Sequence, residues 1–87
     1  MLVPALVKPK KGKFSAHMIN GILVLTTKSE AKNGKANSEI TTEIKKMLKK
    51  EKYSEVEIKI HGEKSKRKTI EIQWQTKGSR DLIDVFG

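Results

Sequence analysis

The segment KANSEITTEIKKMLKKEK, residues 35–52, decides which fold this chain can adopt. Its apolar side chains recur at the 3.6-residue period of an α-helix, so they form a single stripe along one side. Glutamates occupy the first half of the segment and lysines crowd toward its end, which is the charge order that the helix macrodipole favours. We therefore predict an amphipathic helix from residue 35 to about residue 52, with Asn33 or Gly34 as its N-cap. The stripe consists of Ala36, Ile40, Ile44, Met47 and Leu48.

Two strands are predicted before this helix. The first, Leu2–Val7, contains Pro4, and we expect it at an edge of the sheet because proline has no N–H to donate to a ladder. Asn20-Gly21 favours a type I′ hairpin turn, in which both central residues need a positive φ. The turn leads into Ile22–Thr27, where both alternate sets of side chains are apolar. That pattern predicts a central strand covered on both faces.

Two more strands and a short helix are predicted after the long helix. In each strand apolar residues alternate strictly with polar ones, so one face should lie in the core. Gly62 opens the turn between them, and Ser79 is the expected N-cap of a last helix over Arg80–Phe86. The inward residues are Val56, Ile58 and Ile60 in one strand and Ile70, Ile72 and Trp74 in the other.

Length and composition limit the class of protein. A chain of 87 residues is expected to form one domain over residues 1–87. The absence of Cys excludes disulfides and thiolate metal sites, and we expect no cofactor. No apolar run approaches the roughly 20 residues that a membrane span needs, and the first charges follow the opening apolar stretch instead of preceding it as in a secretory signal. We expect a cytoplasmic monomer with no membrane partner.

The net charge of +9 favours a polyanionic partner such as RNA, because phosphate contacts dominate the affinity of proteins for nucleic acids. The same Lys-rich composition is also typical of the surface of thermophilic proteins. Arginine, which reads phosphates and guanine edges better than lysine, occurs only at Arg67 and Arg80. Charge alone therefore leaves both interpretations open.

Two short basic stretches form the candidate site, one at the start of the long helix (33–37) and the other in the turn at 62–68. A helix N-terminus offers unpaired N–H groups and a partial positive charge, so it can bind an anion. If the turn folds beside it, the two stretches and the first loop would surround a phosphate of RNA or another polyanion. In the alternative, Asn37 and Ser65 only join the turn to the helix by hydrogen bonds and the lysines are solvated. The candidate residues are Lys13, Lys35, Asn37, Ser65, Lys66, Arg67 and Lys68.

These motifs resemble the small YggU-like proteins, a domain family of unknown function. The resemblance is carried by Gly34-Lys35-Ala36-Asn37 and by Gly62-x-x-Ser65-Lys66-x-Lys68-Thr69-Ile70, and it covers about residues 7–86. Pro9-x-x-Gly12-Lys13-Phe14 and Gly78-x-Arg80-Asp81-Leu82 are similar to its archaeal members. The resemblance implies an α+β, two-layer α/β domain: a mixed four-stranded sheet with two helices on one face, in the order β-β-α-β-β-α. It implies no settled activity.

The chain departs from the family pattern in the strand that enters the turn, which is one residue longer. Because one residue reverses the faces of a strand, we expect a β-bulge near Lys59.

Two other classes of function stay open. A small phosphate-ester hydrolase would need a nucleophile, and Ser65 with Lys68 has the spacing of a Ser-x-x-Lys pair, although in a turn instead of a helix. A protein-interaction or adaptor module would use the first strand or the last helix.

Overall fold

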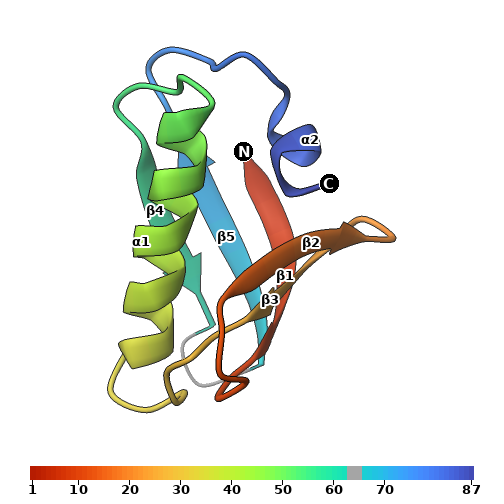
Figure 1. Cartoon of the computed structure of the whole chain (residues 1–87), viewed down its shortest axis with the longest axis vertical. Helices are drawn as coiled ribbons and strands as arrows, with labels where there is room; N and C mark the ends of the chain where they lie inside the picture. The colour runs from red at the N-terminus through yellow and green to blue at the C-terminus, as the bar shows by residue number, and fades with distance from the viewer. Residues whose placement is uncertain (63–65) are drawn as a thin grey trace.

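The computed structural model of the chain describes residues 1–62 and 66–87. Within these ranges a mixed sheet forms one layer and two helices form the other (Figure 1). The elements in chain order are β1 (Leu2–Lys8), β2 (Ser15–Ile19), β3 (Ile22–Thr26), α1 (Lys35–Lys50), β4 (Glu57–His61), β5 (Arg67–Gln73) and α2 (Leu82–Phe86).

Over the described residues the sheet has five strands, in the order β2-β3-β1-β5-β4. β1 runs parallel to β3, and every other neighbouring pair is antiparallel. The α+β class, the mixed sheet and the two helices are confirmed. The predicted four strands and the order β-β-α-β-β-α are wrong, because Ser15–Ile19 adds a strand and the order becomes β-β-β-α-β-β-α. The additional strand is the first arm of the predicted hairpin, whose turn residues Asn20 and Gly21 have φ of 50° and 79°.

Pro4 does not place β1 at an edge, so that prediction is wrong. The N–H of Val7 donates to the carbonyl of Lys66 at 2.8 Å, so the odd-numbered residues of β1 direct their N–H groups toward β5. The nitrogen of Pro4 therefore faces β3, and the register with β3 begins only at Ala5. The absence of an N–H at Pro4 therefore removes no hydrogen bond between strands. β1 occupies the centre of the sheet.

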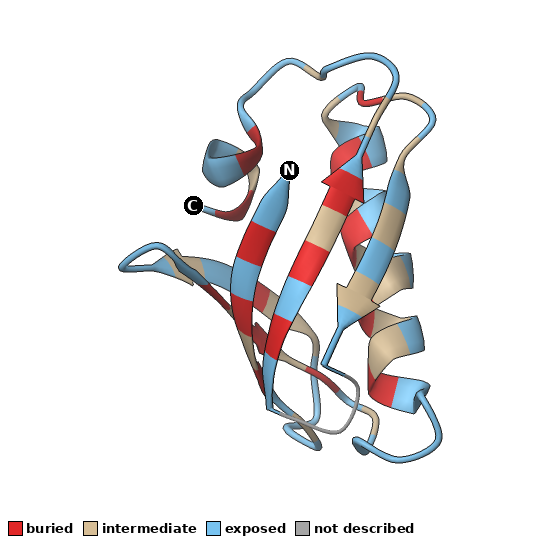
Figure 2. Ribbon diagram, turned by 180° about the vertical axis from the view of Figure 1, so that it is seen from behind, coloured by how far each residue is buried: buried red, intermediate tan, exposed pale blue. Residues whose placement is uncertain are grey.

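β3 is covered on one face only, which also differs from the prediction. Leu23, Leu25 and the following Thr27 are buried beneath the helices. Ile22 is 43% exposed and Val24 is half-buried on the other face. Figure 2 looks onto that face, and the described elements leave it open.

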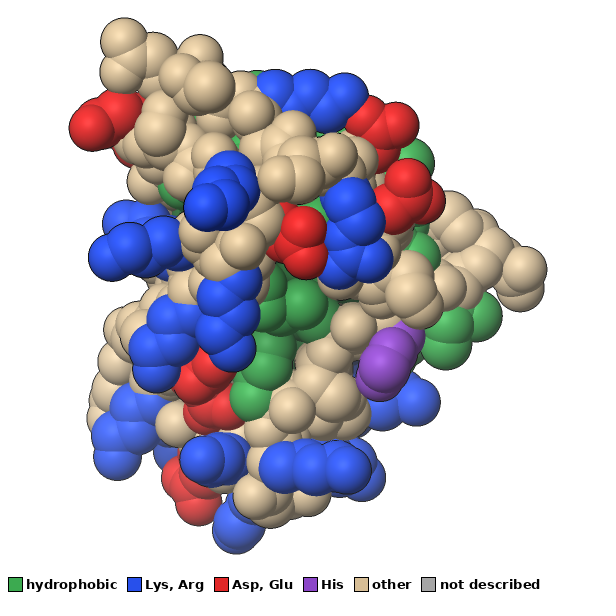
Figure 3. Space-filling model, turned by 45° about the horizontal axis from the view of Figure 1, so that its top comes forward, with side chains coloured by type: hydrophobic (Ala, Val, Ile, Leu, Met, Phe, Trp, Pro, Cys, Tyr) green, Lys and Arg blue, Asp and Glu red, His purple; other side chains and the backbone are tan. Residues whose placement is uncertain are grey.

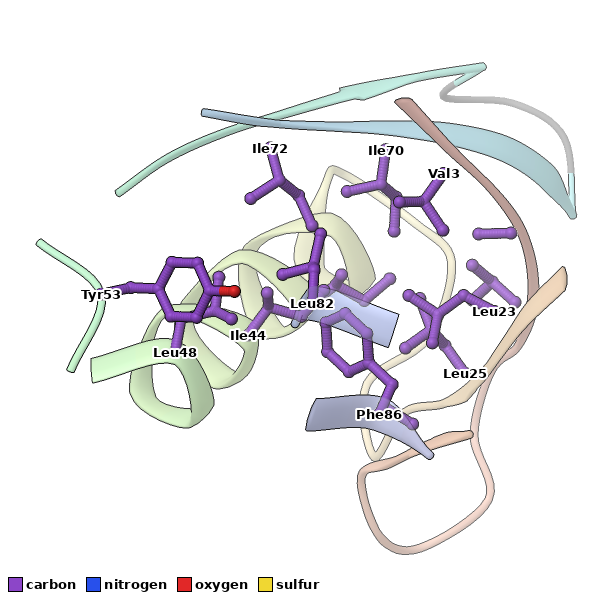
Figure 4. Packing of buried hydrophobic residues seen from close by; sticks show 14 residues of the cluster. Val3, Leu23, Leu25, Ile44, Leu48, Tyr53, Ile70, Ile72, Leu82 and Phe86 are labelled. Carbon is purple, nitrogen blue, oxygen red and sulfur yellow. The ribbon is translucent and has the colours of Figure 1, made fainter. Parts of the chain in front are cut away.

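The core lies between the sheet and the two helices (Figure 4). The predicted stripe of α1 is confirmed: Ala36, Ile40, Ile44 and Leu48 are buried and Met47 packs against the cluster. Strands β1, β3 and β5 contribute the opposing surface, and α2 closes one side with Leu82 and Phe86, as Figure 4 shows. Both helices thus cover the same face, as predicted.

The last helix is shorter than predicted and is not capped by Ser79. It begins at Leu82 with Asp81 as N-cap. The N–H of Ser79 instead donates to the carbonyl of Glu51 at 2.7 Å, and the hydroxyl of Tyr53 donates to the carbonyl of Arg80 at 2.7 Å. The segment before α2 is therefore attached to the end of α1.

The predicted β-bulge near Lys59 is also wrong. β4 and β5 pair without interruption from Glu57 opposite Gln73 to His61 opposite Thr69. The additional residue lengthens the ladder toward the turn, so Ile58 and Ile60 keep their inward direction without a bulge.

Candidate polyanion-binding site

The loops of the predicted site lie at one end of the molecule, which we call the basal end and define as residues 8–13, 28–39, 62 and 66–68. Figures 1 and 2 both place the start of α1, the β1–β2 loop, the end of β4 and the start of β5 there. These residues carry ten Lys and Arg side chains and two Glu. Figure 3 shows basic side chains crowded along the lower edge of the view, where this end lies.

The helix start is built around Gly34. This residue has a φ of 69° and accepts the first α-helical hydrogen bond, from the N–H of Ser38 at 2.9 Å. Gly34 fulfils one of the two predicted N-cap assignments, and it has no side chain with which to cap the helix. Lys35 follows as an exposed residue, and Asn37 is half-buried.

The start of α1 and the end of β4 are neighbours. They share a hollow of about 380 Å³ that is lined by Asn37, Ser38, Thr41 and Thr42 from the helix and by Ile60 from the strand. Apart from Ile60, the lining side chains carry amide or hydroxyl groups. The structure therefore brings together the helix start and the strand that enters the predicted turn.

Strand alternation separates the basic residues of the turn. Lys68 points toward the helix-covered face, is 8% exposed, and its Nζ donates to the carbonyl of Gly62 at 2.8 Å. Arg67 is exposed on the opposite, open face. Lys66 is exposed beside Val7, and Ser65 lies outside the described residues.

The remaining predicted residue, Lys13, is exposed in the loop between β1 and β2. Its carbonyl accepts a hydrogen bond from the hydroxyl of Thr26 at 3.0 Å, which holds the loop against β3. All the predicted residues that the structure describes lie at the basal end, and the side chain of Arg67 points to the open face of the sheet. The others are Lys13, Lys35, Asn37, Lys66 and Lys68.

Glu39 is a component of the basal end that the sequence did not reveal. Its carboxylate accepts the N–H groups of Lys28 at 2.8 Å and Ser29 at 2.9 Å. Partial burial raises the pKa of Glu39, but these backbone hydrogen bonds outweigh it and hold the pKa below its ordinary value. The sequence showed only a glutamate that suits the helix dipole, so its contact with a loop ten residues earlier had no local signal.

The second glutamate of the basal end, Glu30, pairs with Lys10 at 3.4 Å. Both carboxylates are thus engaged with groups of the basal end itself. Among the described residues of this end, basic side chains therefore outnumber acidic ones by ten to two.

The described residues offer little support for metal binding or for ester hydrolysis. Nowhere in residues 1–62 and 66–87 do three or more His, Asp or Glu side chains gather so that they could hold a metal ion. The hydrolase hypothesis depends on Ser65, which is not among the described residues, and on Lys68, which is already bonded to Gly62. In the part of the chain that the structure describes, no helix has the length and apolar character needed to cross a membrane.

No protein-family model, no curated protein and no solved structure matches this chain. The resemblance to the YggU-like family stays a prediction made from the motifs.

Proposed function

We propose that this protein binds RNA or another polyanion through its basal end. The observation that carries the proposal is the polar hollow between Asn37 on α1 and Ile60 on β4, set in a region with ten basic and two acidic side chains. A phosphate at this point would meet a helix N-terminus and the ammonium groups of surrounding loops.

The position of Lys35 supports a binding role. The first turn of α1 contains no acidic residue, and it begins with a lysine, where the helix dipole opposes a positive charge. The far end of the same helix follows the dipole, with Lys49 and Lys50 in its last turn. Local rules are most often broken where function requires it, so an exposed lysine at the unfavourable end points to an anionic ligand.

The proposed recognition is of phosphate and not of bases. All four aromatic residues pack in or against the hydrophobic core, so none offers a stacking platform of the kind found in RNA-recognition motifs. We therefore expect weak dependence on base sequence and strong dependence on salt. The aromatic residues are Phe14, Tyr53, Trp74 and Phe86.

The test is a salt titration of the affinity for a fluorescent oligouridylate, measured by anisotropy for the full chain and for Lys35→Gln/Lys66→Gln. Each lysine that contacts a phosphate of single-stranded RNA contributes about 0.7 to the slope of log K against log salt. The double variant should lose about 1.4 of that slope and at least roughly tenfold in affinity near physiological salt. Parallel titrations with double-stranded RNA and with polyphosphate distinguish the sources of the phosphate.

The matched control is Lys45→Gln/Lys49→Gln. It removes the same charge from exposed positions of the same helix, beginning ten residues, or about 15 Å, beyond Lys35. Equal losses in both double variants would show attraction by net charge alone and would overturn the proposed site, as would binding that does not change with salt.

A further inference from the structure

The outer edge of β4 presents backbone groups that the proposed function does not use. β4 ends the sheet order, and Figure 2 shows that among the described residues no strand lies along its outer side. At Ile60 the side chains of α1 leave a hollow of about 380 Å³ beside the strand. An unpaired edge of this kind offers N–H and C=O groups with which another strand can pair.

The groups directed to this edge belong to Ile58 and Ile60. The N–H of Ile72 donates to the carbonyl of Met1 at 2.8 Å, and the amino group of Met1 donates to the carbonyl of Ile72 at 2.8 Å. Even-numbered residues of β5 therefore bond to β1, and odd-numbered residues bond to β4. Ile58 and Ile60 stand opposite even-numbered residues, so their N–H and C=O groups point outward. The residues of β4 that bond to β5 are Glu57, Lys59 and His61.

The exposed side chains at this edge alternate in charge. Glu57 and Lys59 are both exposed, and among the described residues neither forms an ion pair. Glu71 stands opposite Lys59 on β5. Its carboxylate is hydrogen-bonded instead to His61 at 3.3 Å and to Gln73 at 2.8 Å. A lysine on an edge strand normally discourages pairing, so the glutamate two residues earlier makes the outcome depend on the register.

One antiparallel register makes β4 complementary to itself. A two-fold axis at Ile58 sets this residue opposite Ile58 of the second copy, and their outward N–H and C=O groups then exchange two hydrogen bonds. The same register sets Glu57 opposite Lys59 twice, in the pairs whose side chains approach most closely. It also sets Val56 opposite Ile60, both half-buried in the single chain. An axis one residue away, at Glu57 or at Lys59, would oppose like charges.

The positive charge of the basal end does not prevent this pairing. β4 runs toward the basal end, so an antiparallel pair directs the two basal ends in opposite directions. Gly62 lies four residues beyond Ile58, so the Gly62 residues of the two copies would be about 27 Å apart. That distance is about three times the Debye length of about 8 Å at physiological ionic strength. At the contact itself Glu57 and Lys59 balance, and the hollow beside Ile60 is lined by uncharged side chains.

We infer that two copies of this chain associate by antiparallel pairing of β4 with β4, which joins their sheets into one continuous sheet. The strand has five residues, so the interface is small and the dimer should form only at high protein concentration. This dimer differs from the monomer expected from the sequence. It goes beyond the proposed function and does not depend on it.

A charge swap tests the inferred register. Sedimentation equilibrium of the full chain over about 10 μM to 1 mM should show monomer and dimer in equilibrium, as expected of a small interface. Lys59→Glu and Glu57→Lys each create two like-charge contacts and should weaken the dimer at least roughly tenfold. Glu57→Lys/Lys59→Glu restores both opposite-charge contacts and should regain most of the lost affinity. An equimolar mixture of the two single variants should form a heterodimer for the same reason.

Backbone amide exchange locates the contact. The N–H groups of Ile58 and Ile60 should exchange more slowly at concentrations that form the dimer than in the monomer. In Lys59→Glu at the same concentration they should exchange as in the monomer. An unchanged far-UV circular dichroism spectrum shows that each variant folds.

Lys11→Glu is the matched control. It makes the same charge change in the β1–β2 loop, which the sheet order separates from β4, and it should leave the dimer unchanged. Lys35→Gln/Lys66→Gln should also leave it unchanged, so the dimer and the basal site can fail independently. A chain that stays monomeric throughout, a swap as weak as the single variants, or a dimer without slowed exchange at Ile58 and Ile60 would each overturn the inference. A loss in Lys11→Glu equal to that in Lys59→Glu would overturn it too.

Discussion

Position 78 requires glycine because neighbouring atoms leave no room for a Cβ, and not because its φ is positive. A Cβ at this position would lie 2.1 Å from the carbonyl oxygen of Glu51 and 2.3 Å from Cδ1 of Tyr53. Neither atom is the flexible end of a side chain, so the segment before α2 would have to move. The Gly-x-Arg-Asp-Leu motif that suggested a family resemblance is therefore explained locally by packing against the end of α1.

Gly78→Ala should lower the free energy of unfolding by about 3 kcal/mol, the upper range for overpacking in a tight site. Urea unfolding followed by tryptophan fluorescence measures it, since Trp74 packs edge-on against Tyr53 with ring centroids 5.2 Å apart. Gly12→Ala is the control, because its Cβ meets open space and only the φ of 81° opposes it, at a cost of about 1 kcal/mol. Equal losses in the two variants would contradict the packing explanation.

At the scale of elements, Glu39 ties the loop after β3 to the first turns of α1. Its carboxylate accepts the backbone N–H groups of Lys28 and Ser29, and bonds from an N–H to a charged acceptor are stronger than neutral ones. This loop leads the chain from the sheet into Gly34. The position of the helix start, and with it the polar hollow, thus depends on a residue outside the predicted site.

Glu39→Gln should therefore destabilise the fold at pH 7 by about 1 kcal/mol. Because the folded state lowers the pKa of Glu39 below its ordinary value of 4.5, its contribution is complete above that pH and is lost as the pH falls through the lowered pKa. The difference between wild type and variant in urea unfolding should accordingly shrink in acid. Glu43→Gln is the comparison, since its pair with Lys46 at 3.8 Å is exposed and worth little. If the difference in the free energy of unfolding between wild type and Glu39→Gln persists in strong acid, Glu39 stabilises the fold through its shape and not through its charge.

The elements show what the sequence could and could not predict. The stripe of α1 and the alternation of β4 and β5 are local patterns, so each was predicted from its own residues. The position of β1 was not, because the consequence of Pro4 depends on where pairing with β3 begins, 18 residues along the chain at Ala5 and Leu23. The doubly apolar pattern of β3 predicted a second cover, and the structure instead leaves that side as a surface.

For the candidate site, too, the local motifs could be predicted from the sequence and the long-range contacts could not. Helix-start and turn motifs indicated two basic segments, and the sheet order places both at the basal end. The sequence did not show that Arg67 and Lys68 point to opposite faces, because that direction depends on where β5 begins. Nor did it show Glu39, whose partners are backbone groups that leave no trace in residue type.

At the scale of the whole molecule, charge is distributed unevenly. The basal end gathers ten of the 19 Lys and Arg residues, while the ion pairs Arg80–Glu51 and Lys77–Asp81 lie at the C-terminal end of α1 and in the segment that joins β5 to α2. Crowding of like charge opposes the folded state through self-repulsion. A surface selected for stability alone would therefore disperse these lysines, and their concentration is expected of a surface selected for binding.

Lys35→Glu tests whether this concentration of charge favours binding at the expense of stability, since it should raise stability and weaken binding. In the first turn of α1 a glutamate agrees with the helix dipole and relieves repulsion at the basal end, so the free energy of unfolding should rise by about 1 kcal/mol in low salt. The gain should fade as salt screens it. Affinity for oligouridylate should fall in the same protein, whereas Lys45→Glu, in the middle of the helix, should change neither quantity appreciably. If Lys35→Glu instead lowers the free energy of unfolding and leaves the affinity for oligouridylate unchanged, the lysine stabilises the fold. The basal end would then show no loss of stability in exchange for binding, and nothing would distinguish it from the rest of the basic surface.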